Sequence, residues 1–111
     1  MYNNVLLVGR AVDKPTIRTI ESGASVGNLT IAVNRPFKSL EGKQEVDFIN
    51  CVMWGPIAIN SADYINKGSL ICVRGFLKTK EETVVFNKEE DLKKNIKSYE
   101  VYVEKINFIK L

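Results

Sequence analysis

Histidine is absent from this chain of 111 residues. Without an imidazole, the sequence offers no Ser-His-Asp or Cys-His nucleophile, no imidazole metal ligand and no histidine-based pH switch. It has two cysteines, Cys51 and Cys72, which are too few and too far apart to form a metal site by themselves. We expect both thiols to be buried and reduced because each lies in an apolar stretch; a disulfide is the alternative.

Long apolar segments are also missing. No run approaches the roughly 18 residues that a membrane helix needs, and the N-terminus lacks the basic head and apolar core of a signal peptide. These absences predict a cytoplasmic protein that does not enter a membrane. The sequence also has no Gly-rich phosphate loop and no cluster of metal ligands, so we expect neither an enzyme nor a cofactor.

The composition is that of an ordinary globular protein, with 45% hydrophobic and 26% charged residues. The length predicts a single domain over 1–111, large enough to bury a core without disulfides. Sixteen Lys and Arg against thirteen Asp and Glu give a net charge of +3. This excess permits an anionic partner but does not require one.

The segment 46–55 alternates in the way that predicts a strand. One face is aliphatic and suits a core; its residues are Ile49, Cys51 and Met53. The other face places the large rings of Phe48 and Trp54 beside the polar Asn50, with Val52 between them. Such a face suits a surface that contacts a flat partner, although aromatic residues are also common in strands that are covered on both sides.

Strands are also predicted over 4–10, 26–34, 70–80 and 99–111, with 17–20 as a continuation of the first. In the second strand, Leu29, Ile31 and Val33 are expected in the core; in the fourth, Ile71, Val73 and Leu77. Gly9 and Gly75 mark expected bends. The segment 35–44 is predicted to be a loop. The segment 81–97 is predicted to be a flexible hairpin, with the mixed-charge run 88–94 as its tip or a short helical turn.

One helix is predicted over 56–66. Pro56 suits its first turn and Gly68 its C-terminal cap. Its buried face is expected to contain Ile57, Ile59, Ala62 and Ile65. An all-β chain of five strands with a helix between the third and fourth has the layout of a five-stranded OB-fold barrel. A generic small β-barrel is the alternative.

Six segments then add a more specific similarity. They read NVLLVGR at 4–10, DKP at 13–15 followed by Arg18, NLTIAVNR at 28–35, DFINCVMWG at 47–55, YINKGSL at 64–70 and VRGFLKTK at 73–80. With all six segments in this order, the chain resembles bacterial-type single-stranded DNA-binding proteins. The resemblance runs from Tyr2 to about Lys80 and resumes less distinctly from Tyr99 to Ile109.

The resemblance implies an OB fold that binds single-stranded DNA with little sequence preference, in replication, recombination, repair or DNA uptake. It also implies a nucleoid-associated homo-oligomer, usually a homotetramer built from dimers, with a dimer as the other possibility. Stacking and phosphate contacts do not by themselves distinguish DNA from RNA.

Carried over by position, the resemblance implies three base-stacking aromatics: Phe37, Phe48 and Trp54. It places a set of cations around them to contact phosphates: Arg10, Arg18, Arg35, Lys38, Lys67, Arg74, Lys78 and Lys80.

The chain departs from the family pattern at two places. Glu81 and Glu82 stand where the family commonly has a further aromatic, with Phe86 as an alternative source of that ring. The family's acidic C-terminal tail, which recruits replication and repair enzymes, is missing, so we expect either a trimmed core or a tail-less paralogue. These departures motivate a second hypothesis: an OB-fold interaction module, such as a primosome-type adaptor, that acts mainly through protein contacts.

Overall fold

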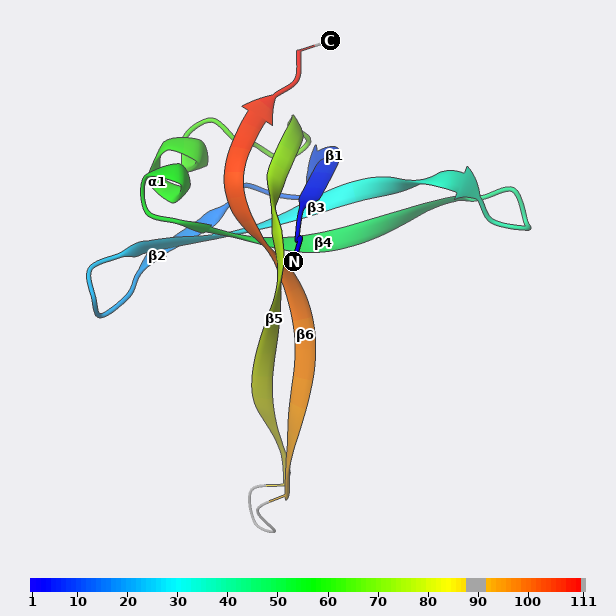
Figure 1. Ribbon diagram of the computed structural model, residues 1–111. Coiled ribbons are helices and arrows are strands. Elements are labelled where there is room, and N and C mark those ends of the chain that lie inside the picture. Colours follow the sequence, from blue (N-terminus) through cyan, green and yellow to red (C-terminus); the bar gives the residue numbers. More distant parts are fainter. Residues whose placement is uncertain (88–91, 111) are drawn as a thin grey trace.

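The computed structural model describes the backbone of residues 1–87 and 92–110 and the side chains of 1–83 and 94–110. Figure 1 shows the elements, which follow in chain order: β1 (Val5–Ala11), β2 (Thr16–Thr19), β3 (Ser25–Lys38), β4 (Gln44–Trp54), α1 (Pro56–Ala62), β5 (Leu70–Asn87) and β6 (Leu92–Phe108). The expected hairpin tip at 88–91 lies outside the described residues, as does the Phe86 side chain.

Five of the strands close into a barrel. The hydrogen-bonded order is β1-β5-β6-β4-β3, and β1 also pairs with β3 through Arg10 and Ala11, which closes the ring. The parallel pair of β4 and β6 is short, with only Cys51 opposite Val101 and Val52 opposite Tyr102. The helix lies between the third and fourth barrel strands. The prediction of an all-β, five-stranded OB-fold barrel is therefore confirmed.

The strand β2 lies outside the ring, beside β3. It pairs antiparallel with β3 from Thr16 opposite Asn28 to Thr19 opposite Ser25. The prediction that 17–20 continues the first strand is therefore wrong. Pro15 has no N–H to donate to the ladder of β1, so the chain turns there and takes a new partner.

The core is formed by the inward faces of the barrel strands and by two residues at the helix. Its fully buried members are Ala11, Leu29, Ile31, Cys51, Met53, Ala58, Ile65, Ile71, Val73, Val101 and Val103. Leu77, which we expected in the core, is 45% exposed. It follows the irregular pairing at Gly75, where the barrel wall ends and β5 continues into a ribbon.

Both cysteines are free thiols, so no disulfide joins them. Cys51 is buried and Cys72 is half-buried. Burial raises the pKa of the Cys51 thiol to about 12, because a thiolate would lose its hydration there. Cys51 is therefore a neutral core residue at physiological pH.

The helix is shorter than predicted. It begins at Pro56 as expected, but it ends at Ala62, and the N–H groups of Tyr64 and Ile65 both donate to the carbonyl of Ser61. Ile65 is fully buried, as predicted, whereas Ile59 is 54% exposed, so its assignment to the buried face was wrong. Gly68 is not the helix cap: it has a φ of 88° in the turn before β5 and donates to the carbonyl of Ala11.

Gly75 allows a backbone approach that no other residue permits. A Cβ at this position would lie 1.9 Å from the carbonyl oxygen of Tyr102. The approach coincides with a register shift between Arg74 and Gly75 in the pairing of β5 with β6. Gly9 has a similar place on β1, where a Cβ would lie 2.4 Å from the carbonyl oxygen of Ala32.

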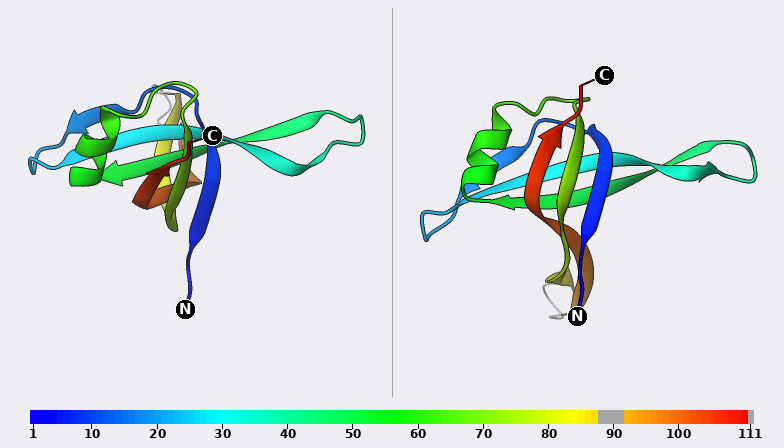
Figure 2. Two further views of the ribbon diagram at one scale, coloured as in Figure 1. Left: turned by 90° about the horizontal axis from the view of Figure 1, so that it is seen from above. Right: turned by 45° about the horizontal axis from the view of Figure 1, so that its top comes forward.

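Two ribbons extend beyond the barrel in different directions, as Figure 1 and the right-hand view of Figure 2 show. One is formed by the distal parts of β3 and β4. Half of the predicted loop at 35–44 belongs to the strands of this ribbon, because β3 reaches Lys38 and β4 begins at Gln44. The other ribbon pairs β5 with β6 from Glu81 opposite Lys97 to Asn87 opposite Leu92. The flexibility expected there stays a prediction. The two ribbons contribute to a radius of gyration of 16.5 Å.

Candidate nucleic-acid interface

Phe48 lies on the outer face of β4, where its ring is 68% exposed. Its direct partner on β3 is Ala32, whose small side chain leaves the ring uncovered. Two residues along β4, Asn50 lies opposite Thr30, and the Thr30 hydroxyl donates to Asn50 Oδ1 at 3.2 Å. This face therefore combines an uncovered ring with a positioned amide.

A hollow of about 420 Å³ places a cation beside Phe48. Its lining residues are Val8, Gly9, Arg10, Ala32, Asn34, Val46, Phe48 and Leu70. The Arg10 guanidinium donates through Nη1 to the carbonyl of Gly68 at 2.9 Å, which holds the side chain at this position. The structure therefore brings Phe48 and Arg10 together, as a stacking and phosphate-binding surface requires.

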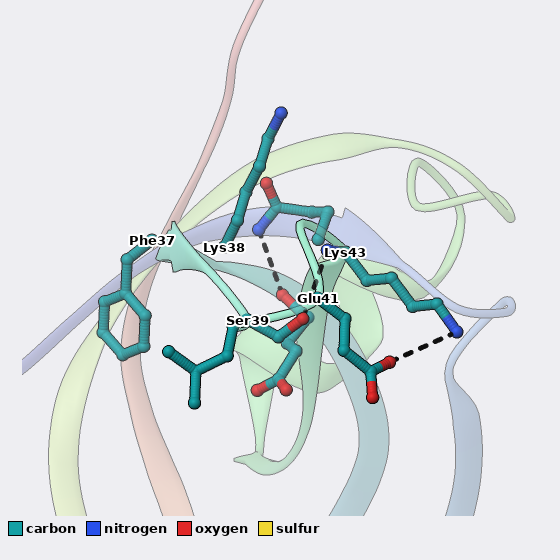
Figure 3. A pocket seen from close by; sticks show the side chains of 8 residues that line it. Phe37, Lys38, Ser39, Glu41 and Lys43 are labelled. Carbon is teal, nitrogen blue, oxygen red and sulfur yellow. Dashed lines mark hydrogen bonds and ion pairs between the residues drawn. The ribbon is translucent and has the colours of Figure 1, made fainter.

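Phe37 lies near the tip of the β3–β4 ribbon and is 65% exposed. It lines a large open hollow of about 710 Å³ together with Lys38, Leu40 and Lys43. In Figure 3 the Phe37 ring and the Lys38 side chain leave the ribbon in different directions, while Lys43 reaches Glu41 at 3.7 Å. The pairing register of β3 with β4 shifts between Asn34 and Lys38, just before the tip.

Arg35 pairs with two carboxylates of the neighbouring strand. Its Nη2 lies 3.0 Å from Asp47 Oδ1, and its Nη1 contacts Glu45. The hydrogen bond from Arg35, reinforced by its charge, lowers the pKa of Asp47, and the same interactions raise the pKa of Arg35. A phosphate that approached Arg35 would therefore compete with both acidic groups.

Replacing Arg35 by glutamine should raise the pKa of Asp47 toward its ordinary value of 3.8. An Asp with a lowered pKa in the folded state contributes stability above its unfolded pKa and loses that contribution as pH falls through the lowered value. The carboxyl resonance of Asp47, followed by NMR from pH 6 to pH 2, measures this change. Lys43→Gln, which removes the partner of Glu41 instead, is the control. An unchanged Asp47 titration in R35Q would contradict the assignment.

Three candidate cations lie on β2 and β5: Arg18, Lys78 and Lys80. Lys80 Nζ forms an ion pair with Glu82 at 3.0 Å. The hydrogen bond and charge of Glu82, with a smaller effect of Glu100, raise the pKa of Lys80, whereas Arg18 opposes the rise because it is a second positive charge nearby. Lys78 lies directly opposite Glu100 of β6. Glu82 and Glu100 thus offset part of the positive charge of these cations.

Trp54 ends β4 and is only partly exposed. Its partner on β3, Val26, is almost fully buried, and the Trp54 indole N–H is itself buried without a hydrogen-bond partner among the described residues. Trp54 therefore contributes to packing as well as to the outer face. The remaining candidate cations are exposed elsewhere: Lys67 in the turn before β5, and Arg74 on β5 opposite Leu6 and Lys105.

Tyr99 was missing from the predicted site. It lies on β6, is 59% exposed and lines a second hollow next to Phe48. An aromatic at the start of a predicted strand was the available signal, but the sequence alone does not place β6 beside β4.

The fold and this surface define a small OB barrel of the class that binds oligonucleotides or oligosaccharides. Among the described residues there is no cluster of three metal-ligating side chains, and no helix there is long and apolar enough to span a membrane. The chain belongs to the single-strand binding protein family, whose model matches residues 2–109. This confirms the resemblance found in the sequence, and a family of binding proteins agrees with the prediction of no enzymatic activity.

Individual relatives agree with this assignment. The chain is 38% identical to single-stranded DNA-binding protein B of Bacillus subtilis over 109 residues, which cover 98% of this chain and 91% of that protein. It is 49% identical over 80 residues to the single-stranded DNA-binding protein of Halalkalibacterium halodurans, covering 72% of this chain. The chain spans about half of that relative, with 48% covered, and 64% of single-stranded DNA-binding protein 3 of Listeria innocua.

Proposed function

We propose that this chain binds single-stranded DNA with little sequence preference. The observation that carries the proposal is the uncovered Phe48 ring beside the anchored Arg10. Every base has a π-face, so stacking on Phe48, Phe37 and the exposed part of Trp54 would tolerate any sequence. The names of the relatives, which are single-stranded DNA-binding proteins, support the same ligand.

Phosphate contacts would come mainly from cations that make no ion pair within the described part of the chain. These are Arg10, Arg18, Lys38, Lys67, Arg74 and Lys78. Arg35 and Lys80 would contribute less, since each already faces a carboxylate. The ligand would thus be held by stacking on aromatic residues of β3 and β4 and by cations of the barrel strands, β2 and the turn before β5.

The same proposal includes self-association, as a homotetramer or a dimer. Leu6 is 64% exposed on β1, which leaves apolar surface for a second copy to cover. A cytoplasmic, nucleoid-associated role in replication, recombination, repair or DNA uptake would follow from binding single strands.

The fluorescence of Trp54, the only tryptophan, provides the test. Titration with oligo-dT at low salt should give saturable quenching that weakens at high salt. The logarithm of the affinity should fall with the logarithm of salt with a slope of about −0.7 per neutralised phosphate. Duplex DNA is the control and should quench much less. Absence of binding by the folded protein, or a flat salt dependence, would contradict the proposal.

The alternative is a module that contacts mainly protein. The observation that favours it is Glu82, which stands near the expected position of a further aromatic and pairs with Lys80 instead. A folded protein that does not bind oligo-dT but assembles as a dimer would support this alternative. Tight, salt-dependent binding of oligo-dT would reject it.

A further inference from the structure

The two ribbons separate at the short seam between β4 and β6. On the N-terminal side of Cys51 and Val101, β4 remains paired with β3 and β6 remains paired with β5. The two ribbons diverge there (Figures 1 and 2). A hollow of about 340 Å³ opens between them, within the range of roughly 300–1,000 Å³ typical of ligand pockets. Its lining residues are Val5, Leu7, Phe48, Ile49, Asn50, Leu77, Tyr99, Glu100 and Val101.

An exposed aromatic residue lies on each of the two separating strands. Phe48 of β4 is 68% exposed, and Tyr99 of β6 is 59% exposed. Tyr99 lies two residues before Val101, where β6 first pairs with β4, and its partner on the other side is the small Thr79 of β5. The remaining lining is largely aliphatic. A planar, uncharged ring system suits such walls.

The polar groups of the hollow favour a base over a phosphate. Asn50 Oδ1 accepts from the Thr30 hydroxyl, which leaves the Asn50 amide N–H groups available as donors. Glu100 also lines the hollow, and its carboxylate would repel a phosphate. Lys78 of β5 lies opposite Glu100 of β6. Its ammonium group can contact the phosphates of a DNA strand that passes outside the hollow.

We propose that this hollow is a subsite for one nucleobase of a bound single strand. The base stacks on Tyr99 and Phe48, and the Asn50 amide donates to an acceptor on its edge. The inference rests on the proposed function and adds Tyr99 to the binding residues. Since all four bases carry an edge acceptor, the subsite tolerates sequence while fixing the position of one nucleotide between the ribbons.

Substitutions of Tyr99 test the subsite through oligo-dT affinity. Tyr99→Ala should weaken binding roughly 5- to 140-fold, the loss expected for one stacked base. The salt dependence should not change, because no charge is removed. Tyr99→Phe should bind like the wild type, and Tyr99→Leu, which keeps apolar bulk without a π-face, should bind as weakly as Tyr99→Ala. Tyr64→Ala, at an exposed tyrosine packed against Phe108, is the matched control.

The outcomes separate the two proposals. If Tyr99→Ala or Tyr99→Leu binds like the wild type while Phe48→Ala does not, the subsite is wrong and the proposed function stands. If Tyr64→Ala loses as much affinity as Tyr99→Ala, the effect is not local and the subsite is rejected. If the folded wild-type protein does not bind oligo-dT, both proposals fail.

Discussion

Binding of oligo-dT should weaken by about 1–3 kcal/mol, or roughly 5- to 140-fold in the dissociation constant, when Phe48 is replaced by alanine. The ring is 68% exposed and lies opposite the small Ala32, so its removal leaves no buried cavity. The free energy of unfolding should therefore change little. Quenching of Trp54 fluorescence measures the affinity, and urea denaturation measures the stability.

Phe108→Ala is the matched control for this substitution. Phe108 lies at the end of β6 opposite Ile71, away from the ribbons, and packs edge-to-face against Tyr64 with ring centroids 6.5 Å apart. Its loss should affect folding more than binding. Wild-type affinity in Phe48→Ala, or equal losses in the two variants, would remove Phe48 from the interface. Trp54→Ala is a less selective probe, since Trp54 is partly buried.

Gly75→Ala should lower the free energy of unfolding by more than the roughly 1–3 kcal/mol typical of overpacked cores. The added Cβ would lie 1.9 Å from the carbonyl oxygen of Tyr102. This oxygen belongs to the backbone of β6, which cannot rotate aside as a flexible side chain does. The strands β5 and β6 must separate or the barrel must distort. The midpoint of urea denaturation measures the loss.

Lys78→Ala is the control for this second prediction, because Lys78 is an exposed residue of the same strand. It should change stability by no more than about 0.5 kcal/mol, as is usual for surface substitutions. A midpoint for Gly75→Ala close to that of Lys78→Ala would show that the backbones can separate at little cost.

The barrel parts of β3 and β4 were predictable because apolar and polar residues alternate along them. Leu29 and Ile31 on β3, and Cys51 and Met53 on β4, lie in the core as their spacing indicates. The errors fall where tertiary contacts decide. Ile17 belongs to β2, which pairs with β3 rather than extending β1, and α1 ends at Ala62 although Ile65, at helical spacing, is apolar and buried.

The candidate site was predictable in part. Phe48 and Phe37 are exposed, as a stacking role requires, and Arg10 lies beside Phe48. Strand alternation does not show that Arg35 faces two carboxylates or that β6 carries Tyr99 to the hollow beside Phe48. Both facts depend on which strands become neighbours, and that choice is made by the closure of the whole barrel.

The projecting ribbons affect how the mass of this protein should be measured. A compact chain of this length has a radius of gyration of about 13 Å, whereas this one reaches 16.5 Å. An extended particle has a larger hydrodynamic radius than a compact one of the same mass. A size-exclusion column calibrated with compact standards would therefore overestimate the mass of a single copy. Light scattering or sedimentation equilibrium, which report mass without assuming a shape, are therefore the appropriate methods for counting copies in solution.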